Sequence, residues 1–113
     1  MAARMTINAD QRAALWRRLD FHLYGCVSCE FDVAEFATLR QRLENVAALL
    51  DQIGWEKDAA ADSFELNLDD SRVVMALARL RAEANEGFEE NESDWAYANE
   101  CLAARDVIDS VLP

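Results

Sequence analysis

The sequence lacks the features that would identify a known chemistry. Its 113 residues include one histidine, one proline, three glycines and three cysteines. It contains no glycine-rich phosphate-binding loop, no G-x-S-x-G nucleophile motif and no H-E-x-x-H zinc motif. The Glu-x-x-His pairs that build di-iron helical bundles do not occur either. We therefore predict a protein that is not an enzyme and that needs no cofactor.

Long apolar runs are also missing. No stretch approaches the ~18 uninterrupted apolar residues that a membrane span requires. The first five residues, MAARM, do not resemble the apolar core of a signal peptide. An odd number of cysteines fits a reducing compartment better than a disulfide framework. We therefore expect a cytoplasmic protein.

Positive charge is scarce and unevenly distributed. Eleven basic residues stand against 22 acidic ones, which gives a formal net charge of −11. Residues 1–50 carry six arginines and six acidic residues, whereas residues 51–113 carry five basic and sixteen acidic ones. The net charge therefore lies entirely in the second half. Such a charge repels phosphate backbones and anionic lipids, so we expect no direct binding to nucleic acid or membranes. A basic protein partner is favoured.

The strongest local pattern predicts a helix over residues 32–55. Asp32 and Glu35 have the spacing of a capping box, and Gly54 is a typical left-handed helix terminator. Apolar residues recur along this segment at spacings of three and four, as one seam. The members of the seam are Phe36, Leu39, Leu43, Val46, Leu50 and Ile53. We expect other helices to cover this seam.

The first quarter of the chain predicts a short strand and another helix. Residues 5–7 are apolar or β-branched and suit a strand, as does the strictly alternating stretch 63–68. Asn8 and Gln11 form a second capping box, so we predict a helix that starts there and stops at Gly25. We expect the two strands to pair as a small ribbon that rests on the helices.

Two further helices follow the second strand. Asp69 or Asp70 caps a helix that we expect to end near Gly87, and Ser93 caps the last one. The predicted buried face of the third helix is Val73, Leu77, Leu80 and Ala84. The predicted stripe of the fourth helix is Trp95, Ala98, Leu102, Ile108 and Val111, with Cys101 beside it. We also expect the three tryptophans to lie mostly in the core.

These elements predict an all-α fold in a single domain over residues 1–113. The order strand, helix, turn, helix occurs twice along the chain. We interpret this as a four-helix domain of two antiparallel helical hairpins with a minor two-stranded β ribbon.

Two short motifs resemble a set of small acidic bacterial proteins. Residues 49–55 read LLDQIGW and residues 64–68 read FELNL, and a helical stretch follows. Proteins of this set carry an LLxxLGW helix end and an FELxL strand, and Ile53 stands where their pattern has leucine. The likeness covers roughly residues 8–88. The set has no assigned function, so the resemblance implies the helical architecture and no chemistry.

Four side chains have the chemistry of a metal site. They are His22, Cys26, Cys29 and Cys101. A C-x-x-C pair, a histidine four residues earlier and one remote cysteine supply the four ligands of tetrahedral zinc. The spacing is half a site, however, because structural zinc sites usually contain two such pairs. We therefore predict buried thiols and no metal, with a zinc-stabilised domain as an alternative.

The densest acidic stretch lies between the third and fourth predicted helices. Its carboxylates, all within twelve residues, are Glu83, Glu86, Glu89, Glu90, Glu92 and Asp94. Carboxylates near a helix C-terminus oppose the helix dipole, and departures from stability rules are expected at functional positions. We predict that this stretch docks a basic partner, in a small accessory or inhibitor protein. The alternatives are a merely solvated turn and a homo-oligomer in which a second copy covers apolar surface.

Overall fold

The computed structural model describes residues 2–28, 33–55, 62–90 and 93–112. Its elements are β1 (Ala2–Thr6), α1 (Ala9–Ser28), α2 (Val33–Ile53), β2 (Ser63–Asn67), α3 (Ser71–Glu90) and α4 (Trp95–Asp109). The predicted mostly helical fold with a small two-stranded antiparallel sheet is confirmed. Within the described ranges, no helix combines the length and apolarity that crossing a membrane requires.

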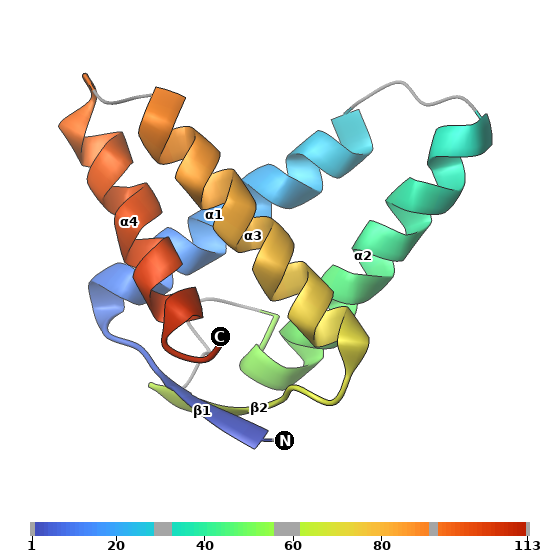
Figure 1. The fold of residues 1–113 in the computed structure, drawn as a ribbon, viewed down its shortest axis with the longest axis horizontal. Helices are drawn as coiled ribbons and strands as arrows, with labels where there is room; N and C mark the ends of the chain where they lie inside the picture. Colours follow the sequence, from blue (N-terminus) through green and yellow to red (C-terminus); the bar gives the residue numbers. More distant parts are fainter. Residues whose placement is uncertain (1, 29–32, 56–61, 91–92, 113) are drawn as a thin grey trace.

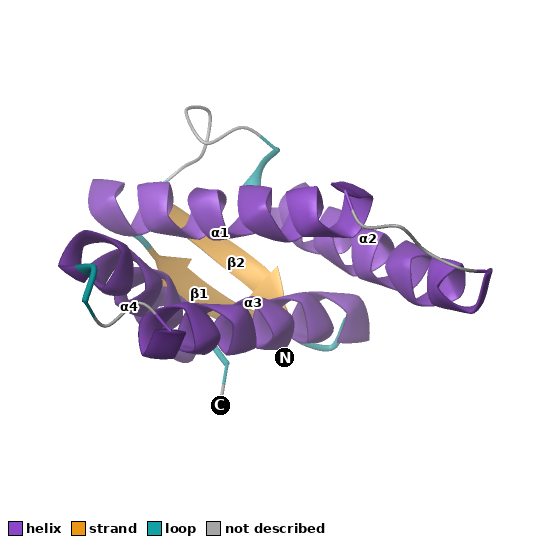
Figure 2. Cartoon of the chain, turned by 90° about the horizontal axis from the view of Figure 1, so that it is seen from above, coloured by secondary structure: helices purple, strands orange, loops and turns teal. Residues whose placement is uncertain are grey.

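The four helices form two layers. Figure 2 shows α1 and α2 in one layer and α3 and α4 in the other, and α1 crosses α3 in Figure 1. The most extensive helix contact joins α3 and α4. Helix α1 packs on α4 and α2 packs on α3, both across the layers, whereas α1 and α2 touch much less. The predicted division into two helical hairpins is therefore not confirmed, because contacts between the layers dominate over contact between α1 and α2.

The ribbon of β1 and β2 closes one end of the helical core (Figure 1). The strands run antiparallel, with Met5 opposite Phe64 and Ala3 opposite Leu66. Met5, Phe64 and Leu66 are buried, because alternate side chains of each strand point to the same face and that face meets the helices. The ring of Phe64 lies 6.4 Å from that of Trp16 on α1. Packing of this kind supplies the support that an isolated two-stranded ribbon lacks.

Two predicted helix boundaries are confirmed by their hydrogen bonds. At the start of α1, the Asn8 N–H donates to Gln11 Oε1 at 3.0 Å, and the Gln11 N–H donates to Asn8 Oδ1 at 2.8 Å. This is the reciprocal pairing of a capping box. At the end of α2, Gly54 has a φ of 99° and its N–H donates to the Leu50 carbonyl at 2.8 Å. That left-handed conformation is the one that glycine adopts without strain.

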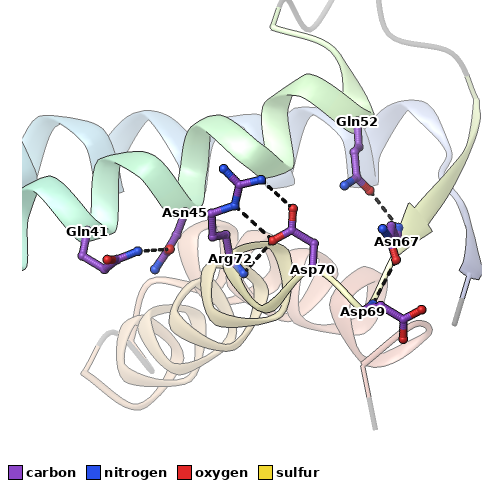
Figure 3. A network of polar contacts seen from close by, with 7 residues as sticks. All are labelled: Gln41, Asn45, Gln52, Asn67, Asp69, Asp70 and Arg72. Atoms are coloured by element: carbon purple, nitrogen blue, oxygen red, sulfur yellow. Dashed lines mark hydrogen bonds and ion pairs between the residues drawn. The ribbon is translucent and has the colours of Figure 1, made fainter.

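Figure 3 shows how the turn between β2 and α3 is attached to α2. Gln52 Oε1 accepts from the Asn67 N–H at 2.8 Å, and Asn67 Oδ1 accepts from the Asp69 N–H at 3.0 Å. Asp70, the second of the two predicted caps, accepts from the Arg72 N–H at 3.0 Å. The side-chain hydrogen bond from Arg72 also holds the pKa of the Asp70 carboxyl below its ordinary value. Side-chain hydrogen bonds therefore fix the start of α3 both to α2, through Gln52, and within its own first turn, through Asp70.

Two predicted helix ends are wrong. Helix α1 continues through Gly25 to Ser28, and α3 continues through Gly87 to Glu90. A glycine inside a helix costs only about 1 kcal/mol relative to alanine, so favourable packing can override it. At Gly87, an added Cβ would lie 2.8 Å from Cys101 Sγ on α4. The missing side chain therefore allows α3 and α4 to approach closely.

The predicted core is correct for most of α3 and α4. All four predicted residues of α3 are buried: Val73, Leu77, Leu80 and Ala84. On α4 the buried stripe is Ala98, Cys101, Ala104, Val107 and Ile108. Leu102 is only half-buried. The predicted stripe therefore missed part of the true one.

Two of the three tryptophans are exposed, which contradicts the prediction that they lie mostly in the core. Trp16 is 6% exposed, whereas Trp55 is 60% and Trp95 71% exposed. The Trp55 indole N–H donates to Asp51 at 2.8 Å at the surface. Trp95 is the first residue of α4 and precedes the residues of this helix that pack into the core. It shares their helical spacing, but that spacing did not suffice to bury it.

The apolar seam of α2 is buried along only part of its length. Val46, Leu50 and Ile53 are buried, but Leu39 and Leu43 are only half-buried. Figures 1 and 2 show the reason, because the N-terminal half of α2 extends beyond the N-terminal start of α3. The prediction that other helices cover the seam is therefore confirmed for its C-terminal part and only partly met in this half, where the side chain of Phe36 lies outside the described part.

Candidate functional site

The predicted acidic docking residues lie where α3 ends and α4 begins. Glu86, Glu89 and Glu90 occupy the last turns of α3 and are exposed. We call these three residues the acidic tip. Glu92, also predicted to contact a partner, lies outside the described residues. The tip is at the opposite end of α3 from the β ribbon (Figure 1).

Asp94 has a structural role in addition to its charge. Its side chain accepts from the Tyr97 N–H at 3.2 Å, which makes it the N-cap of α4. The prediction that Ser93 is this cap is wrong by one residue. An aspartate satisfies an otherwise unpaired N–H there and also interacts favourably with the helix dipole. Asp94 is exposed and follows the acidic tip by four residues along the chain.

Glu83 is half-buried and belongs to a polar cluster between α1 and α3. His22 Nδ1 shares hydrogen bonds with its two carboxylate oxygens, at 2.9 and 3.1 Å. The Arg79 Nε–H donates to Glu83 Oε1 at 3.0 Å. Burial raises the pKa of Glu83, but the hydrogen bonds and charges of His22 and Arg79 outweigh it, so the pKa lies below its ordinary value. Of the predicted docking residues, Glu83 therefore has the most extensive contacts within the chain.

Acidification is expected to weaken the fold through Glu83. A carboxyl whose pKa is lowered on folding contributes stability that is fully present above its unfolded pKa of about 4.3. That contribution is lost as the pH falls through the lower folded value. Thermal melts between about pH 7 and pH 3 should therefore show a steeper loss for the native chain than for Glu83→Gln. Parallel curves for the two proteins would contradict this assignment.

Arg18, on α1, has the most deeply buried charged side chain of the described chain, and this side chain points towards α4. It is 5% exposed, and its Nη1–H donates to Tyr97 Oη at 2.7 Å. Its Nη2 lies 3.5 Å from Glu100 Oε1, and Arg17 reaches the other oxygen of Glu100 at 3.2 Å. The guanidinium carbon also lies 4.7 Å from the ring centres of Phe21 and Tyr97. A buried cation needs such partners, because its desolvation is costly.

The possible zinc ligands are only partly described. Cys29 and the side chain of Cys26 lie outside the described part. The structure places His22 against Glu83, and Cys101 is fully buried between α3 and α4. Burial raises the pKa of the Cys101 thiol, which disfavours the thiolate that zinc binds. Among the described residues, no group of three or more potential ligands is arranged to hold a metal ion.

Ion pairs leave the acidic tip as uncompensated charge. Nine arginines lie within salt-bridge distance of a carboxylate: Arg4, Arg12, Arg17, Arg18, Arg40, Arg72, Arg79, Arg81 and Arg105. None of these pairs within the described chain includes Glu86, Glu89 or Glu90. Among the described residues, most arginines are therefore paired with carboxylates other than those of the acidic tip.

The cluster around Arg18 was not predicted from the sequence. A signal was present, because Arg18 shares the helical face of Leu15 and His22, at spacings of three and four residues. A charge on an apolar face needs a buried partner. Its partner Tyr97 lies 79 positions away, so the pairing could not be read locally.

Comparison of the chain with protein-family models, with curated proteins and with solved structures finds no match.

Proposed function

We propose that the protein is a non-enzymatic, cytoplasmic interaction module whose acidic tip docks a basic protein partner. The observation that supports this proposal is that Glu86, Glu89 and Glu90 are exposed and lie outside the ion pairs of the described chain. Complementary charge speeds the encounter of two proteins and selects among partners. In this proposal, α3 and α4 act as one helical hairpin that presents the tip at its turn.

The position of the tip also favours a functional role. Glu89 and Glu90 lie in the last turn of α3, which contains no basic residue. Carboxylates there oppose the helix dipole, at a cost of about 0.3–1 kcal/mol each. Residues that lower stability without a packing role are candidates for function.

Reversing the charge of the tip is expected to separate binding from stability. The variant Glu89→Lys/Glu90→Lys should keep its fold and gain about 0.6–2 kcal/mol in unfolding free energy from the loss of two unfavourable carboxylates, because positive charge suits a helix C-terminus. It should lose the basic partner that the native chain captures from an extract of the source cells. Mass spectrometry of the captured proteins, at low and high salt, measures this loss.

The control variant has the same change in net charge, but on α1 instead of at the acidic tip. Asp10 and Asp20 are exposed on α1 and form none of the ion pairs of the described residues. The variant Asp10→Lys/Asp20→Lys should retain the partner, although Asp10 lies in the first turn of α1 and its loss costs about 0.3–1 kcal/mol. Equal capture by both variants, or no basic protein captured by the native chain, would rule out the proposed docking site.

A further inference from the structure

The N-terminal half of α2 presents an apolar groove at the surface. Leu39, Leu43 and Ala47 are half-buried, and together with Arg40 and Glu44 they line a groove of about 300 Å³. This part of α2 extends past α3, the helix that covers the remainder of the seam (Figure 2). The apolar spacing of three and four residues, which predicts burial, thus continues into the part of α2 that α3 does not cover.

This half of α2 lies in the part of the chain whose charges balance, away from the acidic second half. Residues 37–47 contain two arginines and one glutamate, within a chain whose net charge is −11. Two copies of so acidic a protein repel each other over most of their surfaces. A surface without net negative charge is where two copies can meet. Arg42, in this segment, is also the one arginine of the described chain outside the ion pairs.

One edge of the groove is complementary to itself. Arg40 and Glu44 lie one turn apart on this edge, 3.2 Å from each other, and their side chains are 73% and 48% exposed. In a two-fold pair of antiparallel helices, the same edge of each helix meets the same edge of the other. Arg40 of one copy then lies beside Glu44 of the other, and the reverse contact forms by symmetry.

We infer that this face binds a second copy of the chain, with α2 against α2 in an antiparallel two-fold pair. Leu39, Leu43 and Ala47 form the apolar contact. This contact is much smaller than the ~800 Å² per partner of a standard interface, so we expect a weak pair, with a dissociation constant on the order of 10–100 µM.

Sedimentation equilibrium of the full chain tests the inference. Between about 5 and 500 µM protein at roughly 0.15 M salt, the average mass should rise from that of one chain towards that of two. Leu43→Glu should raise the dissociation constant at least about 30-fold, because it places a carboxylate in the apolar contact. Thr38→Glu is the control, since Thr38 is exposed and lies outside the groove lining, and it should change the constant less than about 3-fold.

A charge swap tests the orientation of the two copies. Arg40→Glu and Glu44→Arg should each raise the dissociation constant about 5–10-fold, because like charges then meet across the interface. The double variant should restore it to within about 3-fold of the native value. Circular dichroism must show that every variant is folded. A constant mass of one chain, a dimer insensitive to Leu43→Glu, or a double variant no better than the single ones would overturn the inference.

Discussion

Replacing Leu77 by alanine is expected to lower the free energy of unfolding by about 2–5 kcal/mol. Leu77 is fully buried on α3, in the core that the helices and the ribbon share. The loss combines the transfer of the removed methyl groups with the cavity that remains. Urea unfolding of the native chain and of Leu77→Ala measures the difference.

Leu43→Ala is the matched comparison, because it removes the same atoms from a half-buried position. At a few micromolar protein it should cost less than about 1.5 kcal/mol, since part of the Leu43 side chain stays in contact with water when one copy folds. The sequence alone makes Leu43 look like a core residue, because it lies in the middle of the apolar seam of α2. Equal losses for the two variants would show that the N-terminal half of α2 is covered within one chain.

Replacing Glu100 by glutamine is expected to cost about 3–5 kcal/mol, more than replacing Arg18 by methionine. Without the carboxylate, the Arg18 guanidinium loses the negative charge that lies 3.5 Å from its Nη2 and keeps only neutral acceptors such as the Tyr97 hydroxyl, at 5% exposure. Its Nε and Nη2 atoms already lack hydrogen-bond partners within the described residues. Removing Arg18 instead leaves Glu100 with Arg17 at 3.2 Å, so no buried charge is abandoned.

The double variant Arg18→Met/Glu100→Gln separates this effect from lost packing. It leaves no buried cation, so its loss should be smaller than the sum of the two single losses by at least about 1 kcal/mol. Urea unfolding of all four proteins gives this coupling energy. Additive losses, or a Glu100→Gln loss below that of Arg18→Met, would show that the ion pair does not balance the buried charge.

Local signals in the sequence determined most of the secondary structure. The capping box of Asn8 and Gln11 and the left-handed Gly54 depend on atoms within three or four residues of each other, so their spacing suffices to predict them. The buried face of α3 follows in the same way from helical periodicity. The sequence also indicated the exposed carboxylates of the acidic tip, because charged side chains at a helix end usually remain in water.

The tertiary structure decided which of the predicted residues are exposed and which are held by contacts within the chain. Glu83 is a member of the acidic stretch by sequence, yet it is held by His22, 61 positions earlier. Gly87 reads as a helix end by sequence, but close contact with Cys101 on α4 makes it an interior position. Such pairings join residues far apart in the chain, so no local pattern contains them.

The extent of burial on each helix was likewise decided by docking. The seam of α2 is uniform in sequence, but α3 covers only its C-terminal half, and Leu43 is left half-buried. Trp95 shares the helical spacing of a core residue and is still 71% exposed. Periodicity defines which side of a helix is apolar, whereas the length and crossing of the neighbouring helices define how much of that side loses contact with water.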